Sequence, residues 1–414
     1  SDEWNELLTY NANDTYATLR GFEGIARTLK RLPLERREAV TRLHRHLLLP
    51  AIPVLMRAAY VGVPLDEQRL NDETRRSRER QDAAAEELSN AIGLPPARAM
   101  RLATSPKQTL EYLRSLGIEL PSSRKDELTI VEEASPVVRM ILRIRKEQKL
   151  LSTYFEPWTR MLERQGDGRL HTIYRPTGTR TGRLSAESEE GGSLQVAPRD
   201  TEDVAFRSLV RAPLGRVIIS ADFATVEMRI AAWLANEPTM LRFFREGIDL
   251  HRATAAYLVA CGERGHVVPI GEFMAELDAW IAAVSKEQRQ SAKGGNFGLV
   301  YGMQEDKLRD YARSNYGVIM TPEESRAMHR GYFALYSAIP AWHERSMENA
   351  QRLGYTETPF GRRRTFDPTD VHAAINTPVQ STASDFALLA MSAVARRYSQ
   401  ENVDAVVIGF VHDS

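Results

Sequence analysis

Four side chains spaced four residues apart constrain this chain more than any other feature of its sequence. Arg289, Lys293, Phe297 and Tyr301 form the series Arg-xxx-Lys-xxx-Phe-xxx-Tyr. On an α-helix this spacing keeps them on one face, which turns by about 40° at each step. Two cations followed by two aromatic rings match the two ends of a nucleoside triphosphate, its phosphates and its flat base. A basic helix with two core aromatic residues would have the same spacing.

Two short apolar runs each lead to an aspartate. Residues 217–221 precede Asp222, and residues 405–411 precede His412 and Asp413. We expect both runs to be buried strands that hold Asp222 and Asp413 close enough to share two divalent cations. Carboxylate oxygens suit Mg²⁺, and a pair of such ions stabilises both the attacking and the leaving oxygen of a phosphoryl transfer. The alternative for each aspartate alone is that it caps a following helix.

Composition excludes some classes of protein and leaves nucleic-acid binding open. A length of 414 residues predicts two or three domains, and the single cysteine, Cys261, excludes a disulfide framework or a cysteine zinc cluster. No apolar run is long enough to cross a bilayer, and no signal peptide is evident. The formal net charge is +0. Because arginines cluster locally, as at 362–364, this neutrality does not exclude DNA as a partner.

The order of predicted elements indicates an α+β protein. Helices are expected over residues 5–32, where Pro33 ends the pattern, and over 35–60. The charged segment 66–92 predicts a long exposed helix. A strand is expected at 170–174, mostly helix from 249 to 353, a hairpin at 356–366 and a helix at 378–399.

These residues together resemble a DNA polymerase I-type (family A) polymerase over nearly the whole chain. Asp222-Phe-Ala-Thr-Val-Glu-Met-Arg resembles motif A of that family, the Arg289–Tyr301 series resembles motif B on the fingers O helix, and Val411-His412-Asp413 resembles motif C. Further matches occur in the family's order. They are Thr181-Gly-Arg-Leu-Ser185, Leu194-Gln195, Asp249-Leu-His251, Phe360-Gly-Arg-Arg-Arg364 and Asn376-Thr-Pro-Val-Gln380.

The resemblance implies a right-hand polymerase fold, with an antiparallel palm sheet, helical fingers and a helical thumb. The expected domains are, in chain order, residues 1–48 as a remnant of the 3′–5′ exonuclease domain (its last helix) and a linker, 49–165 as the thumb with a palm-base helix, 166–248 as palm with motif A, 249–354 as fingers with motif B, and 355–414 as palm with motif C. The expectation is a fragment that lacks most of the exonuclease domain and the end of the palm. No proofreading is therefore expected of it.

The resemblance also implies a role for each matching residue. Asp222 and Asp413 would hold two Mg²⁺ ions, for which Mn²⁺ could substitute. Arg289, Lys293 and His251 would bind the phosphates of the dNTP, with Lys293 also giving a proton to pyrophosphate. Phe297 would stack on the nucleotide, and Tyr301 with Glu227 would exclude a ribose 2′-hydroxyl. Contacts to primer–template DNA would come from Arg180, Arg183, Gln195, Asn376, Gln380 and His412.

The implied activity is template-directed DNA synthesis in replication or repair, by a monomer without membrane contact in a bacterial or phage-infected cytoplasm. A single-subunit RNA polymerase is the alternative enzyme, which Glu227 and Phe297 argue against, and a non-catalytic DNA-binding module is the alternative without chemistry. The chain departs from the family at Gly294-Gly295, where two helical glycines cost about 1 kcal/mol each and predict a softer helix. Ser414 replaces the glutamate usual after the motif C aspartate.

Overall fold

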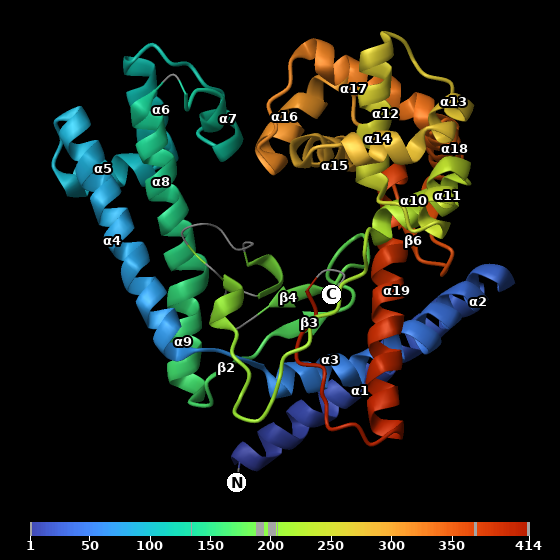
Figure 1. Cartoon of the computed structure of the whole chain (residues 1–414). Helices are drawn as coiled ribbons and strands as arrows, with labels where there is room; N and C mark the ends of the chain where they lie inside the picture. The colour runs from blue at the N-terminus through green and yellow to red at the C-terminus, as the bar shows by residue number, and fades with distance from the viewer. Residues whose placement is uncertain are drawn as a thin grey trace.

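The computed structural model describes residues 2–133, 135–187, 194–197, 204, 206–367 and 371–411. Helices dominate these residues, and the strands form three two-stranded antiparallel sheets. Figure 1 shows two helical bodies on opposite sides of the molecule, one in blue and teal and one in yellow and orange, above a base that contains the short green strands. Long helices with small antiparallel sheets agree with the predicted α+β class.

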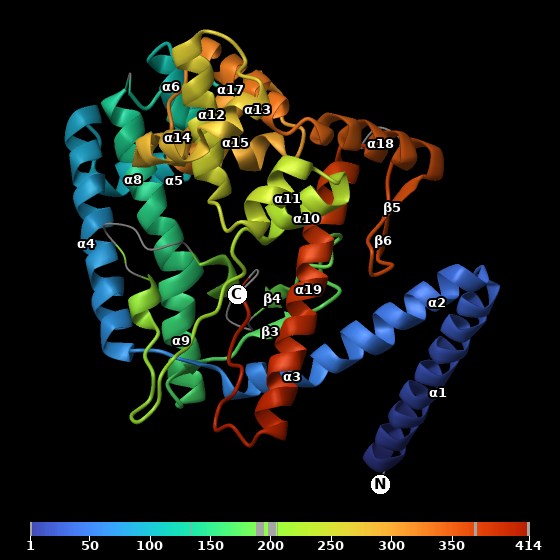
Figure 2. The ribbon, with the colours of Figure 1, turned by 45° about the vertical axis from the view of Figure 1, so that its right-hand side comes forward.

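The first helices follow the sequence pattern closely. They are α1 (Asp2–Arg31), α2 (Leu34–Arg42), the π-helical turn η1 (Leu43–Leu48) and α3 (Leu49–Val61). Pro33 lies between α1 and α2, as predicted, because its ring cannot continue the first helix. Most of the described side chains of α1 are exposed, Trp4 and Phe22 among them. Figure 2 shows α1 apart from the rest of the chain, beside α2.

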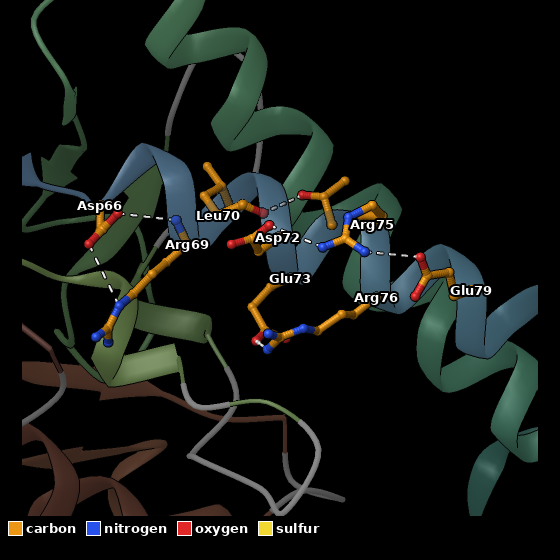
Figure 3. A network of polar contacts seen from close by, with 9 residues as sticks. Asp66, Arg69, Leu70, Asp72, Glu73, Arg75, Arg76 and Glu79 are labelled. Carbon is orange, nitrogen blue, oxygen red and sulfur yellow. Dashed lines mark hydrogen bonds and ion pairs between the residues drawn. The ribbon is translucent and has the colours of Figure 1, made fainter.

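The charged segment forms α4 (Glu67–Ile92), as predicted, but only one of its faces is exposed. Its N-cap is Asp66, whose carboxylate accepts a hydrogen bond from the backbone N–H of Arg69 at 3.1 Å. The buried face, which includes Leu70 and Leu88, packs on α8 (Pro136–Leu150). On the exposed face, Figure 3 shows Arg75 between two carboxylates of the same helix. Many cations of α4 therefore already have acidic partners.

The other helices of this body connect or extend α4 and α8. They are α5 (Pro96–Thr104), α6 (Pro106–Ser115), α7 (Lys125–Ile130), the π-helical turn η2 (Leu151–Phe155) and α9 (Glu156–Gln165). Arg145 of α8 joins several of them. Its guanidinium donates hydrogen bonds to the carbonyl of Ala103 at 2.6 Å, to the hydroxyl of Thr109 at 2.8 Å and to the carbonyl of Ser123.

The base contains short strands and two 3₁₀ turns. They are β1 (Val63–Pro64), β2 (Arg169–Leu170), β3 (Ile173–Arg175), β4 (Ser185–Glu187), η3 (Leu194–Val196) and η4 (Phe206–Leu209). The single strand predicted at 170–174 is wrong, since β2 pairs with β1 and β3 pairs with β4. The chain changes partner between Leu170 and Ile173, which an alternating pattern of side chains cannot reveal.

Two further strand predictions are wrong. Residues 217–221 and 405–411 are not strands in the part of the chain that the structure describes. Val217 and Ile219 are 81% and 80% exposed, so the first run is not buried either. An apolar run becomes a strand only when a partner strand accepts its backbone hydrogen bonds. The runs do approach each other, because Arg216 pairs with Asp404 at 2.8 Å.

The second helical body and the last elements follow. They are α10 (Val226–Ala235), α11 (Pro238–Arg245), α12 (Leu250–Arg264), α13 (Ile270–Ala275), α14 (Leu277–Ala283), α15 (Lys286–Leu299), α16 (Glu305–Tyr316), α17 (Pro322–Leu335), α18 (Ala338–Leu353), β5 (Tyr355–Glu357), β6 (Arg363–Thr365) and α19 (Ala373–Gln400). The predicted hairpin is confirmed, with Thr356 opposite Arg364. The last helix begins five residues before the predicted start, and Pro378 lies inside it.

Candidate active site

The series from Arg289 to Tyr301 lies on α15 and just beyond its end. A capping box begins the helix, in which Ser285 and Gln288 each bond the other's backbone N–H. Arg289, Lys293 and Phe297 follow on one face, one turn apart. The helix ends at Leu299, so Tyr301 lies in the turn that follows it. The predicted helix is therefore confirmed for the first three residues, and Tyr301 continues from it without being helical.

The helix passes unbroken through the two glycines that predicted a softer segment. Both are buried, and each faces a neighbouring helix. A Cβ on Gly294 would lie 3.2 Å from the ring of Tyr316 in α16, and one on Gly295 would lie 2.4 Å from the sulfur of Met328 in α17. The missing side chains thus permit close packing of three helices.

The guanidinium of Arg289 is held by a carboxylate from the start of α12. Its Nε and Nη2 donate to the same oxygen of Asp249 at 2.9 and 2.7 Å. Asp249 also caps α12 by accepting from the N–H of Arg252 at 2.9 Å. Burial alone would raise the pKa of Asp249, but the Arg252 N–H and the Arg289 guanidinium outweigh it and lower that pKa. Sequence reasoning missed this partner, although Asp249 before a helical run is a recognisable N-cap.

His251 is buried beside the same face of α15. Its ring centroid lies 5.8 Å from that of Phe297, and its Nδ1 lies 2.8 Å from the side-chain nitrogen of Asn296. Burial lowers the pKa of His251 to about 4. The negative charge of Asp249 opposes this shift, and the positive charges of Arg289 and Lys293 add to it. His251 is therefore neutral at physiological pH. Asn296, which also bonds Thr254, was not predicted as a partner because only the folded chain brings them together.

Three predicted residues from distant parts of the sequence meet at Glu227, in the first turn of α10. The hydroxyl of Tyr301 donates to one carboxylate oxygen of Glu227 at 2.5 Å, and the guanidinium of Arg183 pairs with the other. Burial and the Glu227 charge both raise the pKa of Tyr301, so its hydroxyl keeps its proton. Glu227 and Tyr301, which were predicted to act together on the sugar, are thus in contact, and Arg183 joins them, while their role stays a prediction.

Of the other residues predicted to contact DNA, those that the structure describes lie in the base and on α19. Gln195 is buried and donates to the carbonyl of Leu184 at 2.9 Å, whereas Arg180 is exposed in the loop between β3 and β4. Asn376 and Gln380 lie one turn apart on α19. The Oδ1 atom of Asn376 is buried and has no hydrogen-bond partner among the described residues.

Asp222 lies four residues before α10 and is exposed. It is not the cap of that helix, because Thr225 occupies the N-cap position. The neighbouring Phe223 packs edge to face on Phe386 of α19, with ring centroids 5.2 Å apart. His412, Asp413 and Ser414 lie outside the described residues. An exposed carboxylate suits a hard divalent cation, although in the described ranges no group of three or more His, Cys, Asp or Glu residues is placed to hold one.

Comparison with known proteins relates this chain to one family of DNA polymerases. The family model for DNA polymerase family A matches residues 70–267 and 273–414. DNA polymerase I of Aquifex aeolicus is 27% identical over 98% of this chain and 67% of its own length. DNA polymerase I of Pseudomonas aeruginosa is 31% identical over 98% of this chain and 42% of its own, and the thermostable DNA polymerase I of Thermus aquaticus is 30% identical over 92% and 44%. The chain thus spans less than half of the last two relatives.

A solved structure supports the same assignment. The POL domain of Pol1 from M. smegmatis, in complex with DNA primer-template and dNTP, matches with a TM-score of 0.71 and 25% identity, over 89% of this chain and 62% of that one. This match confirms the predicted right-hand polymerase fold. Among the described helices, none is long and apolar enough to cross a membrane. From its motifs, its fold and the family model, we conclude that the chain belongs to DNA polymerase family A.

Proposed function

We propose that this chain is the polymerase part of a DNA-directed DNA polymerase, which adds dNTPs to a primer 3′-hydroxyl as a template directs. The observation that carries the proposal is the contact of Tyr301 with Glu227 at the end of a helix whose other end presents Arg289. Such a helix can bind a triphosphate at one end and distinguish deoxyribose from ribose at the other. The relatives named DNA polymerase I support the same activity.

The dNTP would bind along the face of α15. Arg289 and Lys293 bind its phosphates, and neutral His251 assists them as a hydrogen-bonding group. Lys293 donates a proton to the pyrophosphate that leaves. Phe297 stacks on the nucleotide, and Glu227 with Tyr301 excludes a ribose 2′-hydroxyl, since an added oxygen there would meet a carboxylate that already has two partners.

Primer–template DNA would cross the base between the two helical bodies. Arg183, Gln195, Asn376 and Gln380 contact its minor groove, whose acceptors look alike for all correct pairs, and Arg180 and His412 are further proposed DNA contacts. Contacts of this kind allow any sequence to be copied, because they depend on the shape of a base pair and not on which bases form it.

Asp222 and Asp413 are the residues that would hold two divalent cations, with Mg²⁺ preferred and Mn²⁺ able to substitute. When bound, such ions lower the pKa of the primer 3′-hydroxyl and neutralise charge on the triphosphate. Asp222 supports this role because its carboxylate is exposed and is not the cap of α10. The resemblance to family A polymerases implies that Asp413 is the second residue that holds these ions.

The domain organisation proposed from the sequence assigns residues 49–165 to the thumb, 166–248 and 355–414 to the palm, 249–354 to the fingers and 1–48 to an exonuclease remnant and linker. The pairing of α4 with α8 and the packing of α12 on α15 support two helical bodies on a common base. A monomer in the cytoplasm of a bacterial or phage-infected cell is the proposed setting, in keeping with the organisms of the relatives.

Primer extension tests the proposal directly. Asp222→Asn is expected to abolish extension while binding of primed DNA, measured by fluorescence anisotropy, stays within about twofold. Asp404→Asn, which neutralises an exposed carboxylate paired with Arg216, serves as the control and is expected to extend normally. Normal extension by Asp222→Asn would remove Asp222 from the metal site. Extension of the unaltered enzyme with rNTPs in preference to dNTPs would indicate an RNA polymerase, and DNA binding without any extension would indicate a binding module.

A further inference from the structure

A buried ion pair joins the β5–β6 hairpin to α19. Nη2 and Nε of Arg362 lie 2.7 and 3.1 Å from one carboxylate oxygen of Asp385. The Asp385 side chain is fully buried, and that of Arg362 is 14% exposed. Taking both charges out of water costs much of what their attraction returns. Overall stability is therefore a weak explanation for the pair, and the groups that surround it are more informative.

Gly182 lies directly against this pair, and no larger residue fits there. Its φ of +74° is left-handed, and a Cβ would lie 2.4 Å from Nε and 2.5 Å from Cζ of Arg362. Its carbonyl accepts a hydrogen bond at 2.9 Å from the hydroxyl of Ser384, the residue before Asp385. The hairpin and α19 thus hold Gly182 from two sides, and both contacts depend on where Arg362 and Asp385 lie.

The residue after Gly182 is Arg183, whose side chain reaches the contact between Glu227 and Tyr301. Its guanidinium pairs with Glu227, the carboxylate that also accepts from Tyr301. The hydroxyl of Thr179 donates to the Arg183 carbonyl at 2.8 Å and closes the turn that carries it. A continuous series of contacts therefore runs across the molecule. In order, it comprises Asp385, Arg362, Gly182, Arg183, Glu227 and Tyr301.

We propose that the Arg362–Asp385 pair is a positioning device for sugar selection, acting through Gly182 and Arg183 on Glu227. This inference rests on the proposed function, in which Glu227 and Tyr301 exclude the ribose 2′-hydroxyl. Arg183 holds one oxygen of Glu227 and leaves the other to Tyr301, so the carboxylate has a fixed direction. Freeing Gly182 lets Arg183 withdraw, and Glu227 then loses that direction.

The test compares the ratio of kcat/KM for a dNTP to that for the matching rNTP. Asp385→Asn is expected to lower this ratio by about 10- to 100-fold, the range in which a small misplacement from a remote substitution acts. Gly182→Ala should act likewise, because its Cβ displaces the Arg362 guanidinium. Ser384→Ala leaves both charges in place and removes only the bond to the Gly182 carbonyl, so it remains informative if the other variants fold poorly. Glu357→Gln is the matched control, since it weakens ion pairs with Arg363 and Arg36 in the same hairpin region without touching Arg362 or Asp385.

A double-mutant cycle separates positioning from a general loss of structure. In a Glu227→Ala background, Asp385→Asn is expected to have no further effect on the ratio, because the group it positions is gone. An undiminished effect there would overturn the inference, as would an unchanged ratio in folded Ser384→Ala and Gly182→Ala while Glu227→Ala alone changes it. An unchanged ratio in Glu227→Ala itself would instead refute the proposal that Glu227 excludes ribonucleotides. The positioning role of the Arg362–Asp385 pair would then be refuted as well.

Discussion

The hydroxyl of Tyr301 donates a hydrogen bond of 2.5 Å to the carboxylate of Glu227, 74 residues away in sequence. This bond joins the turn after α15 to the first turn of α10. Because Tyr301 is largely buried, losing its proton beside a carboxylate is unfavourable, and the phenol remains a donor throughout the physiological range. The bond therefore persists across the pH range in which a polymerase works.

Glu227→Ala is expected to admit ribonucleotides, because the carboxylate that the 2′-hydroxyl would meet is removed. The ratio of kcat/KM for dNTP to that for rNTP should fall roughly 100-fold, since rejection by an ill-placed polar group is a strong form of discrimination. Tyr301→Phe removes only the hydrogen bond and should give a smaller decrease. Glu246→Ala, which removes a carboxylate paired with Arg242 at the end of α11, is the control. Equal ratios in all three variants and the parent would contradict the assignment of Glu227.

The pair between Asp249 and Arg289 predicts an acid-sensitive contact. The folded pKa of Asp249 is lowered, so its contribution to stability is complete above the unfolded value of about 4 and is lost as the pH falls through the folded value. The free energy of unfolding should therefore decline below about pH 4, and less so in Asp249→Asn. Urea unfolding at several pH values measures this, with exposed Asp278→Asn as the control. The prediction fails if Asp249→Asn retains the full decline.

His251 is expected to remain neutral through the neutral range. NMR titration of its ring should give a midpoint near 4 rather than near 6.5. The unfolded chain takes up a proton first as the pH falls, so the stability contributed by neutral His251 is complete above about pH 6.5 and declines between there and pH 4. His251→Gln should flatten that part of the stability profile, while exposed His266→Gln should not. A ring that titrates near 6.5 would show that it is not desolvated.

Arg145 is predicted to stabilise the α4–α8 body through its contacts with α5, α6 and Ser123. Arg145→Met keeps the apolar stem but leaves the acceptors at Ala103, Thr109 and Ser123 without their donor. The free energy of unfolding should fall by at least about 2 kcal/mol, since each unpaired buried group costs about 1–3 kcal/mol. Arg143→Met, two residues away, removes an exposed pair with Glu87 and should cost less than about 1 kcal/mol. Denaturant titration of both variants tests the contrast, and similar losses would count against it.

Local features of the fold were predictable, while contacts between distant segments were not. The helix that carries Arg289, Lys293 and Phe297 follows from spacing, and Pro33 marks a helix boundary because its ring imposes one. Asp249 as the partner of Arg289 depends on how α12 packs on α15, for which a single sequence holds no signal. The same limit applies to Asn296 beside His251.

The strand predictions failed for a related reason. Residues 217–221 and 405–411 have the apolar composition of buried strands, but composition records a preference and pairing requires a neighbour. In the described part of the chain their backbones do not pair with another strand, and Val217 is exposed. The metal-binding role of Asp222 stays a prediction, which now depends on the motif that precedes α10 and no longer on a buried strand.

Gly294 and Gly295 have a mechanical consequence. Since Tyr316 and Met328 rest almost directly on the backbone of α15, the helix cannot roll about its own axis without driving that backbone into one of these side chains. These contacts couple α15 to α16 and α17, so we expect the three helices to move together as one unit.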